Sequence, residues 1–293
     1  MNLRESCRRA AEILRRAEVP EPDLDAWYLL EYVTGVGRAA YFADPDREMT
    51  PQQQDAYEAC IRRRAQRIPL QHITGEQEFM GLLFRVNEHV LIPRQDTEIL
   101  VEEALGQIRN GRLPVSDDKG QTAEILDLCT GSGCILLSVL YYAGRMKGQA
   151  VRGTGSDLSE KALETARDNA KRLGISAAFV HSDLFENLTG RYAMILSNPP
   201  YIRSADIEGL QPEVRLHDPR MALDGDADGL AFYRRITEES GDHLEQGGIL
   251  MFETGCDQAA DVSELMRGHG FADITVKKDL SGLDRVVYGR YSK

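Results

Sequence analysis

The chain has 293 residues, a formal net charge of −12 at pH 7 and a sequence pI near 5.1. That length is enough for one ordinary α/β domain and a smaller second domain. The acidic balance argues against duplex DNA or ribosomal RNA as the substrate, because proteins that bind them present a basic face. Acidity near a site would suit a cationic ligand, but net charge alone identifies no partner.

Three amphipathic segments at the start of the chain predict a small helical domain over residues 1–75. Helical periodicity covers 2–17, 23–33 and 50–67. Thr50 and Pro51 form a helix cap followed by a first-turn proline, which fixes the start of the third helix. The basic stretch Arg62–Arg67 is interpreted as a solvated helix face, with a docking surface as the alternative.

A linker and a larger domain follow. Residues Glu78–Val90 alternate in polarity, which predicts a β-hairpin, and we assign 76–92 to this linker. The catalytic domain is then 93–293. It opens with a helix from Thr97 through Ile108 and a polar loop over 110–122.

Strand and helix patterns alternate through the rest of the chain, which predicts an α/β fold with a mostly parallel sheet of about seven strands. The first strand starts at Glu124 and runs into a glycine-rich turn. Later strands are expected near 149–155, 177–181, 192–197, 248–253, 272–277 and 285–290. Helices are expected over 136–143, 160–173 and 231–245.

The glycine-rich turn is Cys129-Thr130-Gly131-Ser132-Gly133. Such a turn lets the backbone approach a ligand closely, and the helix after it offers unpaired amide groups. It departs from the dinucleotide fingerprint, because Cys129 stands where the first glycine would be and no later glycine completes the pattern. A phosphate-binding P-loop is excluded, since no Gly-Lys-Ser/Thr follows.

Acidic residues follow the next two strands. Asp157, at the end of the second strand, is placed to accept both hydroxyls of a ribose, while Ser159 caps the next helix. Asp183 and Leu184 follow the third strand, where an acid and an apolar side chain could hold the amine and face of an adenine. Taken alone, an acid here is more often an ordinary solvated turn residue, and it is the place of Asp183 in the series of strand ends that favours a ligand role.

The most informative segment is Asn198-Pro199-Pro200-Tyr201, directly after the apolar strand 192–197. The double proline ends the strand and holds Asn198 extended. The Asn198 side-chain oxygen and the Pro199 carbonyl could then accept both hydrogens of a planar NH2 group, with the Tyr201 ring packed against it. A simple strand-ending turn is the alternative.

The segment 202–229 is too long and too rich in charge, proline and glycine to be a simple connection. Loops of that length are usually disordered or functional. Because it follows Tyr201 directly, our hypothesis is that it helps to form a wall against which the substrate docks.

These features fall at the carboxyl ends of four successive strands, where open α/β sheets bind ligands. Together with 91–98, 212–220 and 279–285, they make the chain resemble class I S-adenosylmethionine-dependent methyltransferases. The resemblance is specifically to the HemK/PrmC family, which methylates a glutamine side chain in peptide-chain release factors. The form Pro-Arg-x-Asp-Thr-Glu at 93–98 separates it from a sister family acting on a ribosomal protein, which reads Pro-Arg-Ser-Pro there.

The resemblance implies a seven-stranded Rossmann-like methyltransferase sheet, with an antiparallel last strand, and a small N-terminal all-helical domain that docks the release factor. It implies methyl transfer from S-adenosylmethionine to the amide nitrogen of the glutamine in a Gly-Gly-Gln motif, leaving S-adenosylhomocysteine. The cofactor-binding residues implied are Arg94, Thr97, Cys129, Thr130, Gly131, Ser132, Gly133, Asp157, Leu158, Asp183, Leu184 and Asn198. Those implied for the substrate glutamine are Asn198, Pro199, Pro200 and Tyr201, with Asn198 and Pro199 as the catalytic pair.

Cellular setting follows from composition. The cysteines are odd in number and form no CxxC pair, and the chain shows no signal peptide or long apolar span. We expect a cytoplasmic, monomeric protein that contacts neither membrane nor nucleic acid directly. No metal is expected, because the histidines lack ligand spacing. Buried structural thiols are expected for Cys7, Cys60, Cys129, Cys134 and Cys256.

Two other functions stay open at this point. A nucleobase methyltransferase could grip the exocyclic amine of DNA adenine or RNA guanine with the same Asn198–Tyr201 segment. The salt dependence of nucleic-acid binding would identify it. A regulatory or scaffolding protein that binds the cofactor with little turnover would keep Asp157 for the cofactor but would not need Asn198–Tyr201 to hold a substrate amide.

Overall fold

The computed structural model describes residues 1–111, 113–115, 122–147 and 149–292, and the chain divides into two compact units. The first unit consists of Met1–Glu76 together with Gln211–His217. The second consists of Gln77–Leu210 and Asp218–Lys293. A short piece of the loop 202–229 therefore belongs to the same unit as the N-terminal helices, although it lies far from them in sequence.

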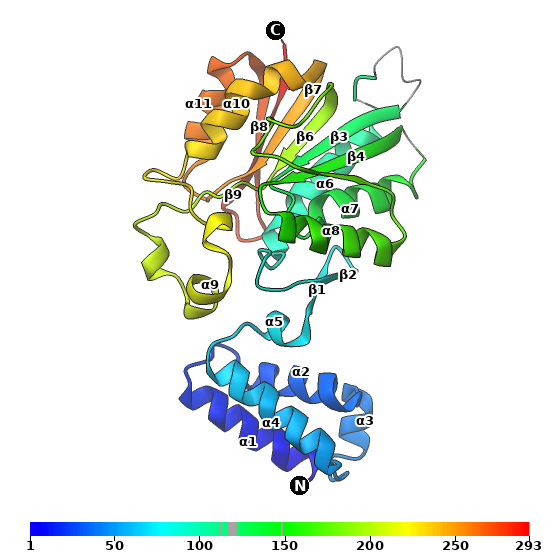
Figure 1. Ribbon diagram of the computed structural model, residues 1–293, viewed down its shortest axis with the longest axis vertical. Coiled ribbons are helices and arrows are strands. Elements are labelled where there is room, and N and C mark those ends of the chain that lie inside the picture. The colour runs from blue at the N-terminus through cyan, green and yellow to red at the C-terminus, as the bar shows by residue number, and fades with distance from the viewer. Residues whose placement is uncertain (112, 116–121, 148, 293) are drawn as a thin grey trace. The chain divides into compact units, whose positions relative to one another are not determined.

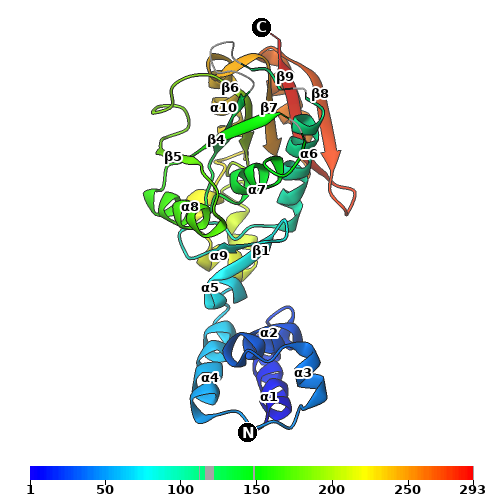
Figure 2. The same cartoon turned by 90° about the vertical axis from the view of Figure 1, so that its right-hand side faces the viewer.

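The first unit is helical. Its helices α1, α2 and α4 pack on one another (Figure 2). The buried apolar core of this unit includes Leu14, Leu29, Leu30 and Tyr57. The three helices predicted from periodicity are confirmed, whereas α3 and α5 are too short to show a period and were missed. The helices of this unit are α1 (Leu3–Arg16), α2 (Pro22–Thr34), α3 (Arg38–Ala43), α4 (Pro51–Ala65), α5 (Leu70–Thr74) and α9 (Pro212–His217).

The basic stretch Arg62–Arg67 is only partly solvated, so its interpretation as a solvated face was wrong for two of its members. The Arg64 side chain is 6% exposed and donates to Asp25 Oδ2 at 2.7 Å and to Glu213 Oε1 at 2.9 Å. Arg67 donates to both oxygens of Glu213, at 2.7 and 2.6 Å. The counter-ion Glu213 comes from α9, and no local pattern around α4 could have indicated it.

Replacing Glu213 by glutamine is expected to lower the free energy of unfolding of the helical unit by about 3 kcal/mol at neutral pH, because Arg64 and Arg67 lose a largely buried counter-ion. Burial acts to raise the pKa of Glu213, but the hydrogen bonds from the two arginines outweigh it and the pKa is lowered. The stabilisation is therefore present above the unfolded pKa of about 4.3 and lost as pH falls through the lower folded value.

Urea unfolding followed by tryptophan fluorescence measures this effect in the right unit, because Trp27 in α2 is the single tryptophan of the chain. The matched control is Glu58→Gln in α4, which removes a half-exposed carboxylate 3.8 Å from Arg62 and should cost less than about 0.5 kcal/mol. Equal decreases in the free energy of unfolding for Glu213→Gln and Glu58→Gln at neutral pH would contradict the prediction.

A short β-hairpin begins the larger unit. Strands β1 (Glu76–Phe79) and β2 (Leu82–Arg85) pair through a two-residue turn in which Met80 has φ 52° and Gly81 has φ 68°. Two successive positive φ values match the twist that hairpin turns require. The predicted hairpin is thus present, but its strands end at Arg85, and the residues from Val86 to Arg94 form no regular element.

The larger unit is built on a seven-stranded sheet in the order β5-β4-β3-β6-β7-β9-β8. Strands β3 to β7 pair in parallel, and β9 is antiparallel to both β7 and β8, so the predicted fold and the antiparallel last strand are confirmed (Figure 2). The strands are β3 (Thr122–Leu128), β4 (Ala150–Asp157), β5 (Ala178–His181), β6 (Tyr192–Ser197), β7 (Leu244–Glu253), β8 (Phe271–Lys278) and β9 (Asp284–Tyr291).

Helices cover both faces of this sheet (Figure 1). Alternate residues of the central strands enter two different cores, as strand geometry requires: Ile125 packs with α6 and α7, and Leu126 packs with α10 and α11. No helix in the described part of the chain combines the length and the apolar character needed to cross a bilayer. The helices of this unit are α6 (Glu98–Arg109), α7 (Cys134–Ala143), α8 (Glu160–Leu173), α10 (Ala231–His243) and α11 (Ala259–Gly268).

Several predicted boundaries differ from the structure. Gln95–Thr97 form a 3-10 turn, so α6 begins at Glu98, and helix α11 was not predicted. The segment 202–229 contains α9 and two short 3-10 turns. The predicted polar loop over 110–122 falls partly outside the described residues, at 112 and 116–121.

The cysteines are all free thiols. Cys134 is buried, and Cys7, Cys60 and Cys129 are of intermediate exposure. Cys256 is exposed, so the expectation of a buried thiol was wrong there. It lies in the turn after β7, where Gly255 and Asp257 flank it and no apolar neighbour in the sequence draws it inward.

Candidate active site

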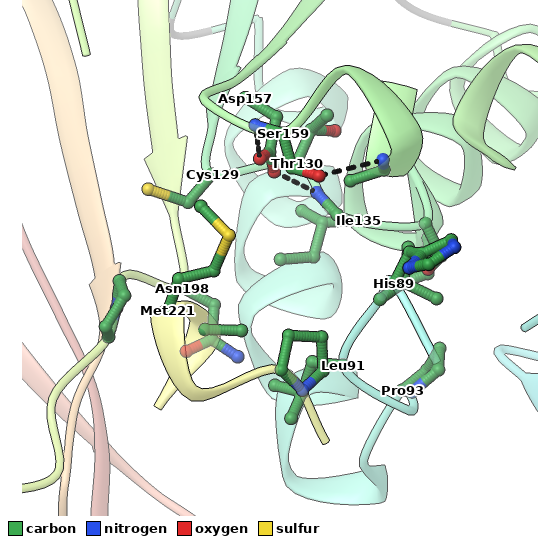
Figure 3. Close-up of a pocket in the computed structure, with 18 of the residues that line it drawn as sticks. His89, Leu91, Pro93, Cys129, Thr130, Ile135, Asp157, Ser159, Asn198 and Met221 are labelled. Carbon is green, nitrogen blue, oxygen red and sulfur yellow. Dashed lines mark hydrogen bonds between the residues drawn. The ribbon is translucent and has the colours of Figure 1, made fainter. Parts of the chain in front are cut away.

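A pocket of about 240 Å³ opens at the carboxyl edge of the parallel sheet, at the ends of β3, β4 and β6 (Figure 3). Residues from the end of the linker, from the glycine-rich turn and from the segment 219–224 complete its walls. Its lining is His89, Val90, Leu91, Pro93, Arg94, Thr97, Cys129, Thr130, Gly131, Ser132, Cys134, Ile135, Asp157, Leu158, Ser159, Ala162, Asn198, Pro200, Pro219, Met221, Ala222, Asp224 and Phe232.

The turn after β3 brings backbone to the pocket wall. Cys129 has φ 58°, a left-handed conformation that glycine adopts without strain, so the cysteine occupies a glycine-like position. Thr130 donates its hydroxyl to the buried Asp127 carboxylate at 2.6 Å, which anchors the turn. Gly131 has φ 54°, and a Cβ added there would meet no atom within 4 Å. The turn therefore presents open backbone, with Gly131 facing free space.

Asp157 ties this turn to the end of β4. Its Oδ2 accepts the Gly131 N–H at 2.9 Å, and its Oδ1 accepts the Ser159 N–H at 2.8 Å. Burial raises the pKa of Asp157 above the usual value, although these two N–H groups act in the opposite direction. Asp157 forms no ion pair with any described residue, and each carboxylate oxygen can accept a further hydrogen bond. Its negative charge is thus available to a ligand in the pocket.

The segment after β6 places two acceptors together. Asn198 lines the pocket, and neither its side chain nor the Pro199 carbonyl receives a hydrogen bond from any described residue. Figure 3 shows the Asn198 side chain and Met221 on the same side of the pocket. An amide oxygen and a carbonyl oxygen without donors are incomplete hydrogen-bonding groups, which makes them candidates for ligand contacts.

Tyr201 leads away from the pocket to a buried acid. Its hydroxyl lies 3.5 Å from Glu253 Oε1 at the end of β7. Burial raises the pKa of Glu253 to about 7, against the effect of a hydrogen bond from Thr97 and the charge of Arg285. Glu253 was not singled out from the sequence, because a glutamate that ends an apolar strand carries no local signal for such a role.

The remaining wall combines residues far apart in sequence. Arg94 Nη2 donates to Asp218 Oδ2 at 2.7 Å, and this ion pair links the Pro-Arg-x-Asp-Thr-Glu motif to the residue that precedes the segment 219–224. Burial raises the pKa of Asp218 to about 6, while Arg94 acts to lower it. Four residues of the loop 202–229 line the pocket (Pro219, Met221, Ala222 and Asp224), and its role as a docking wall for the substrate stays a prediction.

Comparison with known proteins gives two matches to sequence families. The family described as the PrmC N-terminal domain matches residues 5–75, and the methyltransferase small domain matches residues 112–211. A release factor glutamine methyltransferase from Caulobacter vibrioides is 39% identical over 96% of this chain and 93% of its own length. The chain belongs to the release factor glutamine methyltransferase family.

Further relatives agree with this assignment. A release factor glutamine methyltransferase from Geobacter sulfurreducens is 42% identical over 91% of this chain and 89% of its own length. Among solved structures, a methyltransferase from Pyrococcus furiosus has a TM-score of 0.52 with 17% identity, covering 73% of this chain and 90% of that chain. At that identity the likeness concerns the fold alone.

The family resemblance implicated residues from five segments of the chain. The structure brings most of them to one pocket: Arg94, Thr97, Cys129, Thr130, Gly131, Ser132, Asp157, Leu158, Asn198 and Pro200. Gly133 does not line it, because the position of its missing side chain faces Leu137 and Ala166 at 3.1 and 3.2 Å. Pro199 and Tyr201 are adjacent to the lining residues but are not among them.

Asp183 and Leu184 are not brought into the pocket. Asp183 Oδ1 accepts from Arg235 Nη2 of α10 at 2.9 Å, and Leu184 is buried in the core beneath α10 and α11. Neither lines the pocket. Their predicted contact with adenine therefore stays a prediction, and it requires a ligand that extends beyond the pocket described above.

Proposed function

We propose that this protein transfers a methyl group from S-adenosylmethionine to the side-chain amide nitrogen of the glutamine in the Gly-Gly-Gln motif of peptide-chain release factors. The observation that carries the proposal is a pair of acceptors without donors, the Asn198 side-chain oxygen and the Pro199 carbonyl, beside a pocket that also contains the unpaired Asp157. Membership of the family supplies the substrate class.

The described residues fit the cofactor. The open backbone at Gly131 leaves room for close approach, and the unpaired carboxylate of Asp157 suits hydroxyl groups and positive charge. We assign cofactor contacts to Arg94, Thr97, the turn 129–133, Asp157, Leu158 and Asn198. The predicted contacts of Asp183 and Leu184 would require the cofactor to extend beyond the pocket, because neither residue lines it. When bound, S-adenosylmethionine supplies an electrophilic methyl group on a positively charged sulfur.

The chain's own residues position the nucleophile. A glutamine amide nitrogen is a weak nucleophile because its lone pair is delocalised into the carbonyl. Asn198 and Pro199 would accept hydrogen bonds from its two N–H groups and so turn the nitrogen toward the cofactor. Pro200, which lines the pocket, and the adjacent Tyr201 would lie against the flat amide group. Orientation of this kind can supply about 7–11 kcal/mol in the best intramolecular cases. The same acceptors would stabilise the positive charge that develops on the nitrogen as the new bond forms, until the nitrogen loses one of its two protons to water.

The other parts of the chain receive proposed roles from the same assignment. We assign the helical domain, residues 1–75, to docking of the release factor, and the hairpin region 76–92 to the linker between it and the catalytic domain 93–293. The wall formed by 219–224 would contact the substrate loop. The protein would act as a monomer in the cytoplasm, without nucleic acid, membrane or metal.

Incubation of the protein with isotopically labelled S-adenosylmethionine and purified release factors tests the proposal. Mass spectrometry of the peptide that holds the Gly-Gly-Gln motif should show one added methyl group on the glutamine. A release factor with alanine at that glutamine is the control and should stay unlabelled. If the label appeared instead in added DNA or RNA, the alternative function of a nucleobase methyltransferase would be favoured and the proposal overturned.

A further inference from the structure

A buried glutamine donates a hydrogen bond to the main chain of the segment Asn198–Tyr201. Gln258, the N-cap residue of α11, is 2% exposed. Its Nε2 donates to the Tyr201 carbonyl at 3.0 Å and to the Gly229 carbonyl at 3.2 Å. Its Oε1 accepts the Gly255 N–H at 3.0 Å. One side chain therefore links three backbone segments: the residues after β6, the end of the loop 202–229 and the residues after β7.

Two glycines allow the backbone of the loop 202–229 to pack directly against the segment Asn198–Tyr201. Gly229 has φ 75°, and a Cβ there would overlap the Tyr201 carbonyl oxygen and lie 2.5 Å from Gln258 Nε2. A Cβ on Gly225 would lie 2.8 Å from Tyr201 Cα and 2.9 Å from the Pro200 carbonyl oxygen. The backbone of the loop thus presses directly on Pro200 and Tyr201, with no side chain between them.

Backbone hydrogen bonds continue this contact along the chain. Ile202 N–H donates to the Leu223 carbonyl at 3.0 Å, and Gly225 N–H donates to the Ile202 carbonyl at 2.8 Å. Leu223 and Gly225 flank Asp224, which lines the pocket. A shift of the loop end would therefore move both the pocket wall and the carbonyl groups next to Asn198.

We propose that Gln258 is a positioning residue for the Asn198–Tyr201 segment, an inference that rests on the function proposed above. Its NH2 group has two hydrogens for two carbonyls, and its oxygen accepts one N–H, so every polar group of the amide is used. A carboxylate could keep only the contact with Gly255, because it has no hydrogen to donate. The side chain does not reach the reacting atoms, so its effect on turnover comes from where it holds Pro199 and Asn198.

The Gln258→Leu variant is expected to lower kcat by about 100-fold, which is the size of effect that a displacement of about 1 Å can cause. The Kd for S-adenosylmethionine should change by less than about threefold, because Asp157 and the turn 129–133 are untouched. Gln258→Glu should show the same loss near pH 8 and a partial recovery toward pH 6. Facing two carbonyls raises the pKa of the introduced acid, and its protonated form regains one donor.

The matched control is Gln107→Leu. Gln107 is also a buried glutamine of the larger unit, but its oxygen accepts from Arg290 at 3.2 Å and it does not line the pocket. The Gln107→Leu variant should lower the midpoint temperature of thermal unfolding without changing kcat at a temperature well below that midpoint. Equal kcat losses for Gln258→Leu and Gln107→Leu would overturn the proposal.

Hydrogen exchange followed by mass spectrometry gives a second readout that needs no turnover. Peptides spanning 198–204 and 223–230 should exchange faster in Gln258→Leu than in the wild type, because the amides of Ile202 and Gly225 lose their support. Unchanged protection there would overturn the proposal even if turnover fell. If the wild type transferred no methyl group to release factors, the proposed function would fail, and the exchange data would still decide the role of Gln258.

Discussion

Asn198→Ala is expected to lower the kcat for methylation of a release factor by about 100- to 1,000-fold, the loss that follows removal of one preorganised hydrogen-bonding group at a reacting centre. The variant removes the side-chain acceptor, which no described residue engages in the free protein. The Pro199 carbonyl alone would leave the substrate nitrogen free to rotate. Single-turnover methyl transfer, followed by mass spectrometry of the Gly-Gly-Gln peptide, measures the effect on the chemical step.

Two further variants make this result specific. Asn198→Asp keeps an acceptor oxygen of nearly the same shape and should retain more activity than Asn198→Ala. Asn187→Ala is the control, because Asn187 is exposed and donates to the His181 carbonyl at 3.0 Å, outside the pocket. A kcat for Asn198→Ala within a few-fold of that for Asn187→Ala would exclude Asn198 from the catalytic role, and a cofactor-binding protein with little turnover would then be the better description.

The parts of the fold that could be predicted are those whose signals are local. Strand β6 was predicted at its observed bounds, because an apolar run that meets two prolines can continue neither as a helix nor as a strand. Helix α8 was likewise predicted at its bounds, since Ser159 caps it and Gly174 ends it in a left-handed conformation. Chain order then placed the ends of these elements at one edge of the sheet.

The parts that could not be predicted depend on partners distant in sequence. Arg64 has the pattern of an exposed helix residue, and its burial follows from Glu213, which lies 149 residues later. Gln258 precedes an ordinary helix, and its link to Tyr201 spans 57 residues. A single sequence carries no record of such pairs, because neither member alters the local hydrophobic period.

Asp183 shows that a place at the end of a strand does not by itself bring a side chain into the pocket. The sequence predicts that it contacts an adenine amine, because it follows the third strand of the parallel sheet as Asp157 follows the second. In the structure, Arg235 of α10 forms an ion pair with it, and the chain after β5 turns into the core through the buried Leu184 and Phe185. A strand end sets the edge of the sheet, but the following residues decide which side chains face the ligand.

Asp157→Asn is expected to raise the Kd for S-adenosylmethionine by about 100-fold, equivalent to about 2.7 kcal/mol. Both oxygens of Asp157 accept backbone N–H groups, from Gly131 and Ser159. An asparagine can satisfy only one of them and turns its own NH2 toward the other, so the turn that carries Gly131 must shift. Loss of a hydrogen bond to a charged group costs about 1.5–3 kcal/mol, and the variant also lacks the negative charge.

Isothermal titration calorimetry with S-adenosylmethionine and S-adenosylhomocysteine measures this affinity, and Asp183→Asn is the decisive comparison. Asp183 is a partly exposed member of an ion pair with Arg235 and does not line the pocket, so its substitution should raise the Kd by less than about threefold. If Asp183→Asn weakened binding as much as Asp157→Asn, the cofactor would have to reach past the described pocket to the end of β5. The adenine contact predicted from the sequence would then hold, and Asp157 would lose its place as the main anchor.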